Sequence, residues 1–341
     1  MKSVRIHEHG DSGVLNWEDV PEPTIKPGHV VVQIKSSSLN HLDIWVRKGI
    51  PGVPLPLTTG SDAAGVIKDV GDNVHDLKMG DPVLIQPLFY CGSCDACNRG
   101  EENLCVQMGI MGENSQGVNS EYLMVPAAQV YPIKTDLSFT EAASIALVGQ
   151  TSFQMIVNRA KLRLGETILI WGASSGVGSA GIQIAKSLGA SVIAIAGTHE
   201  KCEKAKSLGA DDVLNYKRDD ILADVKSITN GRGVNVVFEH VGAASWDMSM
   251  KTLARGGRVV TCGATTGFNA NLNLTHIFFK QQSILGSTMG SKSAFEGAMG
   301  LVNKGELKPV VDRIFPIQEI APAHDYLASG EQFGKVVLSY E

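Results

Sequence analysis

The stretch "ILIWGASSGVGSAG", residues 168–181, constrains the fold of this chain more than any other feature. An apolar run typical of a buried strand ends in a turn of small residues, and a helical pattern follows. Further strand-like runs alternate with helical patterns: "ASVIAIAG", "DDVLNY", "VNVVFEHVG", "GGRVVTCG" and "QQSILGST". Six strands that alternate with helices predict an α/β chain with a parallel, doubly wound sheet, which we place at residues 127–288.

Residues 1–126 have a different pattern. Short β-rich runs, "VVVQI", "AAGVI", "DPVLIQ" and "EYLMVP", are separated by the turn signals "KPGH", "VGDN" and "KMGD". This pattern predicts a compact, mostly β domain. Residues 289–341 are mixed, with a helical pattern in "SAFEGAMGLVNKGEL" and a closing strand in "FGKVVLSY".

Composition excludes several classes of protein. The chain has 341 residues, 43% of them apolar, and a net charge of −5. A mildly acidic chain has no basic surface for nucleic acid, so we expect no nucleic-acid partner. No run approaches the ~20 apolar residues of a membrane span, and "MKSVRIHEHGDSG" lacks the apolar core of a signal peptide. We therefore expect a cytoplasmic protein without a membrane partner, whose cysteines serve a metal or catalysis.

Four of the six cysteines lie within fifteen residues: Cys91, Cys94, Cys97 and Cys105. Four thiolates complete a tetrahedral Zn²⁺ site and leave no position for substrate, so the spacing predicts one structural zinc ion per chain. An iron–sulfur cluster and four free thiols are the alternatives. The x7 gap before the fourth cysteine, followed by valine, departs from the bacterial ferredoxin run of x3 followed by proline.

The turn after the strand at 168–171 predicts a pyrophosphate site at a helix N-terminus. In the usual register, its positions are Ala173-x-Ser175-x-x-Gly178, and the literal match that starts at Gly176 would lie inside the helix. The next strand ends at Gly197-Thr198, where an NAD-specific site usually has an acidic residue. Thr198 and Lys201 favour NADPH. Glu200 argues for NADH, the alternative cofactor, although we expect it on the following helix.

Together, the cysteine segment, "GASSGVG", "SLGADDVLNY", "VFEHVG", "GGRVVTCGATTG", "SILGST" and "FGKVVL" resemble the medium-chain dehydrogenase/reductase superfamily. Within it, "LNHLDIWVRKG" and "GSDAAGVI" are most similar to the quinone oxidoreductase-like branch. The resemblance implies a GroES-like catalytic domain at 1–126, a Rossmann domain at 127–288, and a segment at 289–341 that completes the catalytic domain. It also implies a homodimer or homotetramer.

The zinc-dependent alcohol dehydrogenases of this superfamily bind a second, catalytic zinc. At its three ligand positions this chain has Asn40, Ser61 and Leu147, and catalytic zinc needs about three protein ligands and one open position. We therefore expect no catalytic zinc, although His41, Asp43 and Asp62 are an alternative ligand set.

The resemblance also implies roles for individual residues. Asn40, Asp43 and Thr151 are the catalytic candidates: Asn40 would hydrogen-bond a substrate carbonyl, Asp43 would chiefly order its loop, and Thr151 would lie near the nicotinamide. Cofactor contacts are expected at the nicotinamide (Thr151, Cys262, Gly263, Ala264, Ser287), the pyrophosphate (Ser175, Gly176, Val177) and the adenosine phosphate (Gly197, Thr198, Lys201, Tyr216).

These expectations predict an NADPH-dependent oxidoreductase that reduces quinones or α,β-unsaturated carbonyls, small molecules whose conjugated carbonyl needs no metal to accept hydride. A zinc-dependent alcohol or aldehyde dehydrogenase is the first alternative. The second is a non-enzymatic NADPH-binding regulatory or RNA-binding protein.

Overall fold

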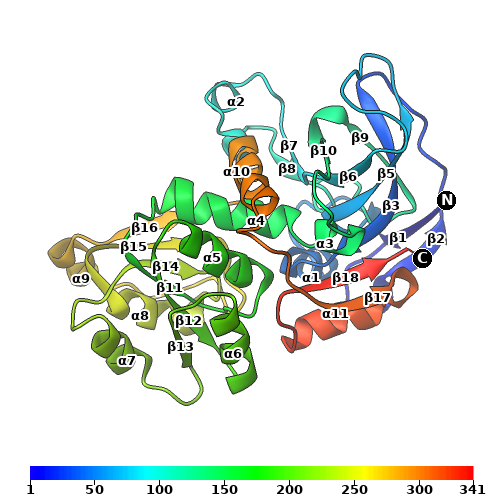
Figure 1. Ribbon diagram of the computed structural model, residues 1–341. Helices are drawn as coiled ribbons and strands as arrows, with labels where there is room; N and C mark the ends of the chain where they lie inside the picture. The colour runs from blue at the N-terminus through cyan, green and yellow to red at the C-terminus, as the bar shows by residue number, and fades with distance from the viewer. Residues whose placement is uncertain (341) are drawn as a thin grey trace. The chain divides into compact units, whose positions relative to one another are not determined.

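The computed structural model describes residues 1–340, and its contacts divide the chain into two compact units (Figure 1). Residues 1–147, together with the chain from Pro309 onward, form unit 1; Val148–Lys308 form unit 2. Both limits lie later in the chain than the expected domain boundaries. The first lies later because α3 (Phe139–Ala143) packs on strands of unit 1, and the second because α10 (Lys292–Asn303) falls within unit 2.

Unit 2 contains the predicted parallel sheet. Its six strands have the order β13-β12-β11-β14-β15-β16, and every pair is parallel. The strands are β11 (Thr167–Ile170), β12 (Ser191–Ala196), β13 (Asp212–Asn215), β14 (Val234–Glu239), β15 (Leu253–Thr261) and β16 (Ser283–Gly286). The order reverses beside β11, which is the first strand of the unit, so the carboxyl ends of β11 and β14 flank the switch point where such sheets bind ligands.

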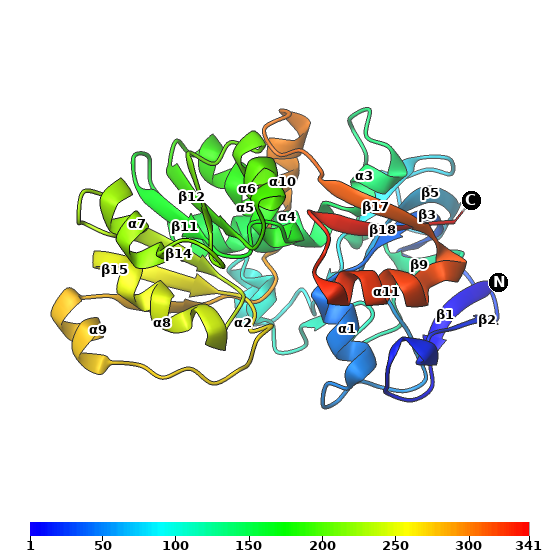
Figure 2. The same ribbon diagram turned by 90° about the horizontal axis from the view of Figure 1, so that it is seen from below.

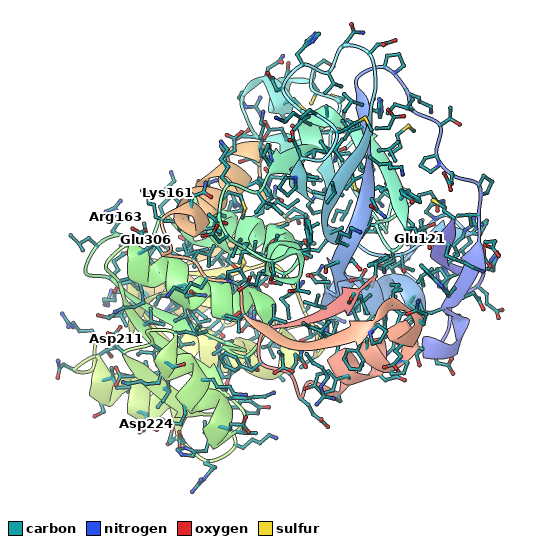
Figure 3. The ribbon with its side chains drawn as sticks, turned by 45° about the vertical axis from the view of Figure 1, so that its right-hand side comes forward. Glu121, Lys161, Arg163, Asp211, Asp224 and Glu306 are labelled. Atoms are coloured by element: carbon teal, nitrogen blue, oxygen red, sulfur yellow. The ribbon has the colours of Figure 1, made fainter. Side chains whose placement is uncertain are left out.

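Helices cover both faces of this sheet, as Figure 2 shows for α5 to α8. Their bounds are α4 (Ala146–Phe153), α5 (Gly176–Ser187), α6 (His199–Ser207), α7 (Ile221–Ile228), α8 (Ala243–Thr252) and α9 (Leu274–Lys280). Ile221 of α7 and Met250 of α8 share one apolar core with Val237 of β14. Asp211, labelled in Figure 3, ties α5 to β12 because its carboxylate accepts hydrogen bonds from Lys186 Nζ and the Val192 amide.

Unit 1 is mostly β structure. Its seven-stranded sheet has the order β10-β6-β5-β3-β18-β17, with β9 paired to β3. Smaller sheets join β2-β1-β4 and β7-β8. The bounds are β1 (Lys2–Ile6), β2 (Asn16–Asp19), β3 (His29–Ser38), β4 (Leu57–Thr58), β5 (Asp62–Val70), β6 (Pro82–Ile85), β7 (Leu88–Phe89), β8 (Gly109–Ile110), β9 (Tyr122–Pro126), β10 (Val130–Pro132), β17 (Val311–Pro316) and β18 (Lys335–Ser339).

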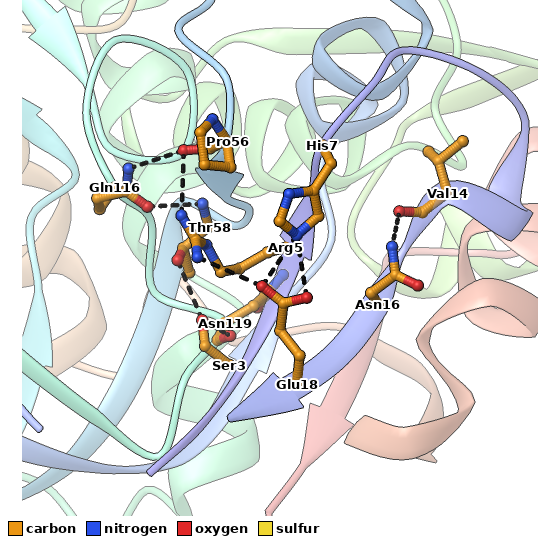
Figure 4. A network of polar contacts seen from close by, with 10 residues as sticks. All are labelled: Ser3, Arg5, His7, Val14, Asn16, Glu18, Pro56, Thr58, Gln116 and Asn119. Atoms are coloured by element: carbon orange, nitrogen blue, oxygen red, sulfur yellow. Dashed lines mark hydrogen bonds and ion pairs between the residues drawn. The ribbon is translucent and has the colours of Figure 1, made fainter. Parts of the chain in front are cut away.

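Polar contacts hold the small N-terminal sheet together (Figure 4). Glu18 on β2 accepts from Arg5 Nη1 at 3.3 Å and lies 3.0 Å from His7 Nε2. Glu121, labelled in Figure 3, accepts a hydrogen bond of 2.7 Å from the Lys2 amide. These contacts connect the first residues of the chain to the loop that enters β9.

The C-terminal segment joins the seven-stranded sheet of unit 1, because β18 pairs antiparallel with β3. Helices α1 (His41–Lys48) and α11 (Ile320–Ser329) share a core with these strands, to which Leu39, Ile44 and Val336 contribute. The pairing places the start of β18 beside the end of β3, where Asn40 lies. Within the described residues, every helix is too short or too polar to cross a membrane.

Candidate functional site

The four cysteines of the predicted metal site lie together in unit 1. Their sulfur atoms are all within 4.8 Å of one another. The Sγ–Sγ distances are 3.9 Å for Cys91–Cys97, 3.6 Å for Cys94–Cys97 and 3.5 Å for Cys91–Cys105. A tetrahedron with metal–sulfur bonds of about 2.3 Å has edges of about 3.8 Å, so the sulfurs fit a bound zinc ion.

Backbone amides also point at these sulfurs. Cys91 Sγ accepts from the Cys94 and Ser93 amides at 3.3 and 3.5 Å. The Ser93 and Cys94 amides lower the pKa of Cys91 to about 6, which favours the thiolate that a metal requires. Gly92 and Gly100 have φ of 73° and 72°, so they adopt the left-handed turns that the loop needs.

A second polar cluster in unit 1 contains Asn40, Asp62 and Lys335, none more than 7% exposed. Lys335 Nζ donates to Asn40 Oδ1 at 2.6 Å and lies 3.0 Å from Asp62 Oδ2. Asn40 Nδ2 donates to Asp62 Oδ2 at 2.9 Å, and the Leu147 amide donates to Asp62 Oδ1 at 2.8 Å. The three positions that correspond to catalytic-zinc ligands therefore lie at or next to a buried ion pair, formed by Asp62 and Lys335.

The alternative zinc site is not assembled. In residues 1–340, the four cysteines are the one group of three or more Cys, His, Asp or Glu side chains with ligand atoms close enough for a metal. Asp62 is bound to Lys335, and Ser61 donates its hydroxyl to the Met111 carbonyl at 2.8 Å. His41, Asp43 and Asp62 do not form such a group.

Asp43 lies in the first turn of α1 and caps the helix. Its carboxylate accepts the Asn40 amide at 2.7 Å, which completes a capping box with Asn40 at the N-cap. The side chain is 1% exposed, and burial raises its pKa to about 7. This geometry matches the expected role of ordering the loop that carries Asn40.

In unit 2, the turn between β11 and α5 presents the expected pyrophosphate donors. Ser175 is the N-cap of α5 and accepts from the Gly178 amide at 2.9 Å. The amides of Gly176 and Val177 make no hydrogen bond to any described residue, so both are available to an anion. The helix begins at Gly176, so the literal glycine match does lie inside it.

His240 supports this turn from the end of β14. Its Nε2 lies 3.0 Å from the Trp171 carbonyl oxygen and 3.3 Å from Ser175 Oγ. Burial lowers the pKa of His240, so the ring is neutral. A Cβ atom at Gly172, whose φ is 57°, would lie 2.6 Å from the His240 ring. The turn can pass this close to the ring because residue 172 is glycine.

The end of β12 holds the residues expected at the adenosine phosphate. Thr198 is the N-cap of α6 and accepts from the Lys201 amide at 3.2 Å, which leaves its hydroxyl hydrogen available. The Tyr216 hydroxyl lies 2.8 Å from where a Cβ at Gly197 would be, so the two positions are neighbours. Glu200 lies on α6, as expected, and pairs with Lys204 at 2.8 Å.

The residues expected at the nicotinamide lie on α4 and at the ends of β15 and β16. The hydroxyls of Thr151 and Ser287 are buried and have no partner among the described residues. Ser152 Oγ donates to the Val177 carbonyl, which places α4 against the phosphate turn. Burial raises the pKa of Cys262 to about 12, so this side chain is a neutral thiol. Gly263 and Ala264 follow in the same loop. Unpaired hydroxyls suit a ligand that has hydrogen-bonding groups, such as the carboxamide of a nicotinamide.

The sequence reasoning missed two residues of these clusters, Lys335 and His240. Both stand in motifs that carried the family resemblance, "FGKVVL" and "VFEHVG". A cavity of about 730 Å³ lies at the opposite, amino-terminal edge of the unit 2 sheet, lined by the segments before β11, β14 and β16. Because parallel sheets bind ligands at their carboxyl edge, the cavity is separate from the cofactor residues.

Comparison with known proteins shows which family has this arrangement. The alcohol dehydrogenase GroES-like domain family matches residues 26–135, and the zinc-binding dehydrogenase family matches residues 176–304. A NAD-dependent alcohol dehydrogenase of Sulfurisphaera tokodaii is 32% identical over 99% of both chains. A quinone oxidoreductase of Rattus norvegicus is 29% identical over 99% of this chain and 97% of its own. A crystal structure of a NAD-dependent alcohol dehydrogenase is 42% identical, with a TM-score of 0.97 and complete coverage of both chains.

These matches span both units, and the four-cysteine cluster and the parallel sheet with its phosphate turn are present in the structure. The chain belongs to the medium-chain dehydrogenase/reductase superfamily and is one of its NAD(P)-dependent oxidoreductases.

Proposed function

We propose that the protein reduces quinones or α,β-unsaturated carbonyl compounds with NADPH, and that it binds one structural zinc ion and no catalytic zinc. The observation that carries this proposal is the contact of Lys335 Nζ with Asn40, at one of the three positions where the family resemblance locates catalytic-zinc ligands, and with Asp62, next to the second position. A site without a Lewis acid does not polarise an alcohol oxygen well. It still suits an acceptor whose own carbonyl withdraws charge.

In this proposal Asn40 binds the substrate oxygen. Its side-chain nitrogen has two N–H groups, one of which goes to Asp62, and the second donates to the carbonyl oxygen as negative charge develops there. NADPH, when bound, supplies the hydride. In this proposal a proton from solvent completes the reduction.

The preference for NADPH rests on the end of β12. Gly197-Thr198 offers a hydroxyl and no carboxylate, and Lys201 and Tyr216 follow on neighbouring elements. Glu200 lies in the first turn of α6, where its exposed side chain forms an ion pair with Lys204. The NAD-dependent relatives favour NADH instead, so the two cofactors must be compared directly.

The second candidate function is zinc-dependent alcohol or aldehyde oxidation. It is favoured by the relatives, because both the 32% identical protein and the 42% identical structure are named NAD-dependent alcohol dehydrogenases. It requires a second metal ion in each chain.

One experiment separates these functions. Oxidation of NADPH and of NADH is followed with enones, quinones, aldehydes and ketones, and zinc is counted in the same sample. We expect turnover with enones or quinones, faster with NADPH, and one zinc ion per chain. Two zinc ions with alcohol turnover would support the second candidate. Cofactor binding without turnover on any acceptor would support a non-enzymatic role.

We also propose that the chain forms a homodimer or homotetramer through the β16 edge of unit 2. This edge strand is largely exposed, and three apolar side chains in the segment that precedes it, Phe268, Phe278 and Phe279, are 84%, 69% and 64% exposed. An unpaired edge next to apolar side chains suits a second copy that continues the sheet.

We propose a cytoplasmic location as well. The four clustered thiols, which include Cys91, need a reducing compartment to avoid oxidation, and this supports the proposal.

A further inference from the structure

The buried ion pair of unit 1 fixes the orientation of one amide. Asn40 Oδ1 accepts from the Lys335 ammonium, and Asn40 Nδ2 donates to the Asp62 carboxylate. A flipped amide would direct N–H groups at the ammonium and an oxygen at the carboxylate, so both contacts would become repulsive. The Asn40 side chain therefore has one favourable orientation, with its second N–H always on the same side.

The surroundings keep this arrangement fixed. Asp62 Oδ1 accepts the Leu147 amide, and Ser38 Oγ lies 3.4 Å from Asp62 Oδ2. The Asn40 backbone is held separately by Asp43. Lys335 is 3% and Asp62 0% exposed, so water does not screen the charges. An ammonium on the amide oxygen polarises the amide and makes its remaining N–H a stronger donor.

We propose that Lys335 is a positioning residue that acts through Asn40: its ammonium orients and polarises the Asn40 amide, which stabilises negative charge on the substrate's carbonyl oxygen. The inference rests on the proposed reduction. Under this inference, the Lys335 ammonium provides the electrostatic stabilisation that the catalytic zinc ion provides in zinc-dependent alcohol dehydrogenases. Lys335 would not touch the substrate.

The test uses the full-length, zinc-loaded enzyme with NADPH and an enone that the wild type reduces. Lys335→Met keeps the length of the side chain and removes its charge. Because this variant leaves Asp62 buried without a partner, a double variant, Lys335→Met with Asp62→Asn, removes both charges together. Asn40→Ala removes the proposed donor. Zinc content shows whether unit 1 still folds in each variant, because the four cysteines lie in that unit. NADPH affinity, measured by fluorescence, shows whether unit 2 still folds, because the expected cofactor residues named above lie there.

We expect Asn40→Ala to lower kcat about 100-fold, the usual loss when one donor to a developing oxyanion is removed. Both Lys335 variants should lower kcat at least tenfold, with KM and NADPH affinity within about threefold of the wild type. Combining Lys335→Met with Asn40→Ala should add less than about threefold to the loss in Asn40→Ala, because the two residues act as one unit.

A series of enones with graded electron-withdrawing substituents separates positioning from a merely structural role. If the amide stabilises the enolate, loss of Lys335 should slow the least activated enones most. A structural role would slow every member equally. Wild-type turnover in the double variant, additive losses with Asn40→Ala, or equal slowing of all enones would overturn the inference. Absence of enone and quinone turnover in the wild type would overturn the proposed function instead.

Discussion

At the scale of single residues, buried polar groups carry the candidate site. Asp43 is the clearest case of two opposing effects on one carboxyl group. Burial raises its pKa to about 7, while the Asn40 amide and the Lys335 charge lower it and Asp62 raises it further. Burial is the largest of these effects, so the folded protein binds the Asp43 proton more tightly than the unfolded chain does.

This proton affinity predicts a pH dependence of stability. The Asp43 pKa is raised on folding, from 3.8 to about 7, so its contribution to stability is greatest below pH 4 and is lost as the pH rises to 7. Between pH 5 and 8, Asp43→Asn should remove roughly 3 kcal/mol of this dependence, because about 1.36 kcal/mol is lost per pH unit up to the folded pKa. Urea unfolding of both proteins between pH 5 and 8 measures it. A difference in unfolding free energy that stays constant over this range would contradict the prediction.

Gly172 supplies a second prediction. Gly172→Ala places a methyl group against the His240 ring in the turn that offers the Gly176 and Val177 amides. We expect NADPH to bind at least tenfold more weakly, or about 1.4 kcal/mol. Gly165→Ala is the matched control, because Gly165 also has a positive φ, 79°, but its Cβ would meet nothing within 4 Å. Equal effects on NADPH affinity would show that backbone strain, and not the contact with His240, is responsible.

At the scale of elements, the cysteine segment, residues 91–105, forms a small loop whose two ends lie close together. Strands β7 and β8 pair at its base, and the short helix α2 (Asp95–Asn98) lies between Cys94 and Cys105. Few apolar side chains stabilise it: Leu104 and Val106 are 61% and 86% exposed. We therefore expect its order to depend on a metal ion bound by the four sulfurs.

Removal of this metal should lower the thermal stability of the protein and change kcat little. Cys94→Ser should lose the zinc and lower Tm by about 5 °C or more, the shift that roughly 2 kcal/mol produces in domains of this size. kcat measured well below the new Tm should change less than about threefold, because the sulfurs leave no position for substrate. Cys202→Ser, a buried thiol outside the segment, should keep its zinc and serves as the control. Loss of kcat in proportion to lost zinc at an unchanged Tm would contradict this view.

The elements were the best predicted part of the chain. All six strands of the parallel sheet and the helix at α5 follow from apolar periodicity, which is a local property. The cysteine cluster follows from spacing within fifteen residues. The Lys335 contacts could not be predicted this way, because 273 residues separate it from Asp62 and 295 from Asn40. His240 was missed for a similar reason, since 69 residues separate it from Trp171.

At the scale of the whole molecule, unit 2 is continuous in sequence and unit 1 is not. The sheet of unit 2 has two edge strands, β13 and β16, and the proposed assembly concerns the β16 edge. The proposed assembly covers this edge with another copy of the chain.

The assembly predicts that charge on β16 separates the copies. Ile284 is 38% exposed on this strand, and Ile284→Lys would place a charged side chain next to the cross-strand neighbours of the second copy. Light scattering after size-exclusion chromatography should show a smaller species than for the wild type. Leu164→Ser, which removes an apolar side chain that is 83% exposed elsewhere in unit 2, should not change the mass. A wild-type protein that is already monomeric would rule out the assembly.

The division of unit 1 has a consequence for biosynthesis. A ribosome completes residues 148–308 before it makes β17 and β18, so the nucleotide-binding half can fold while the sheet around β3 still lacks two strands. Until translation reaches residue 335, Asp62 has no countercharge. If the proposed reduction is right, a nascent or truncated chain that ends at residue 330 should bind the dinucleotide but lack the Lys335 ammonium, so activity would be the last property the growing polypeptide acquires.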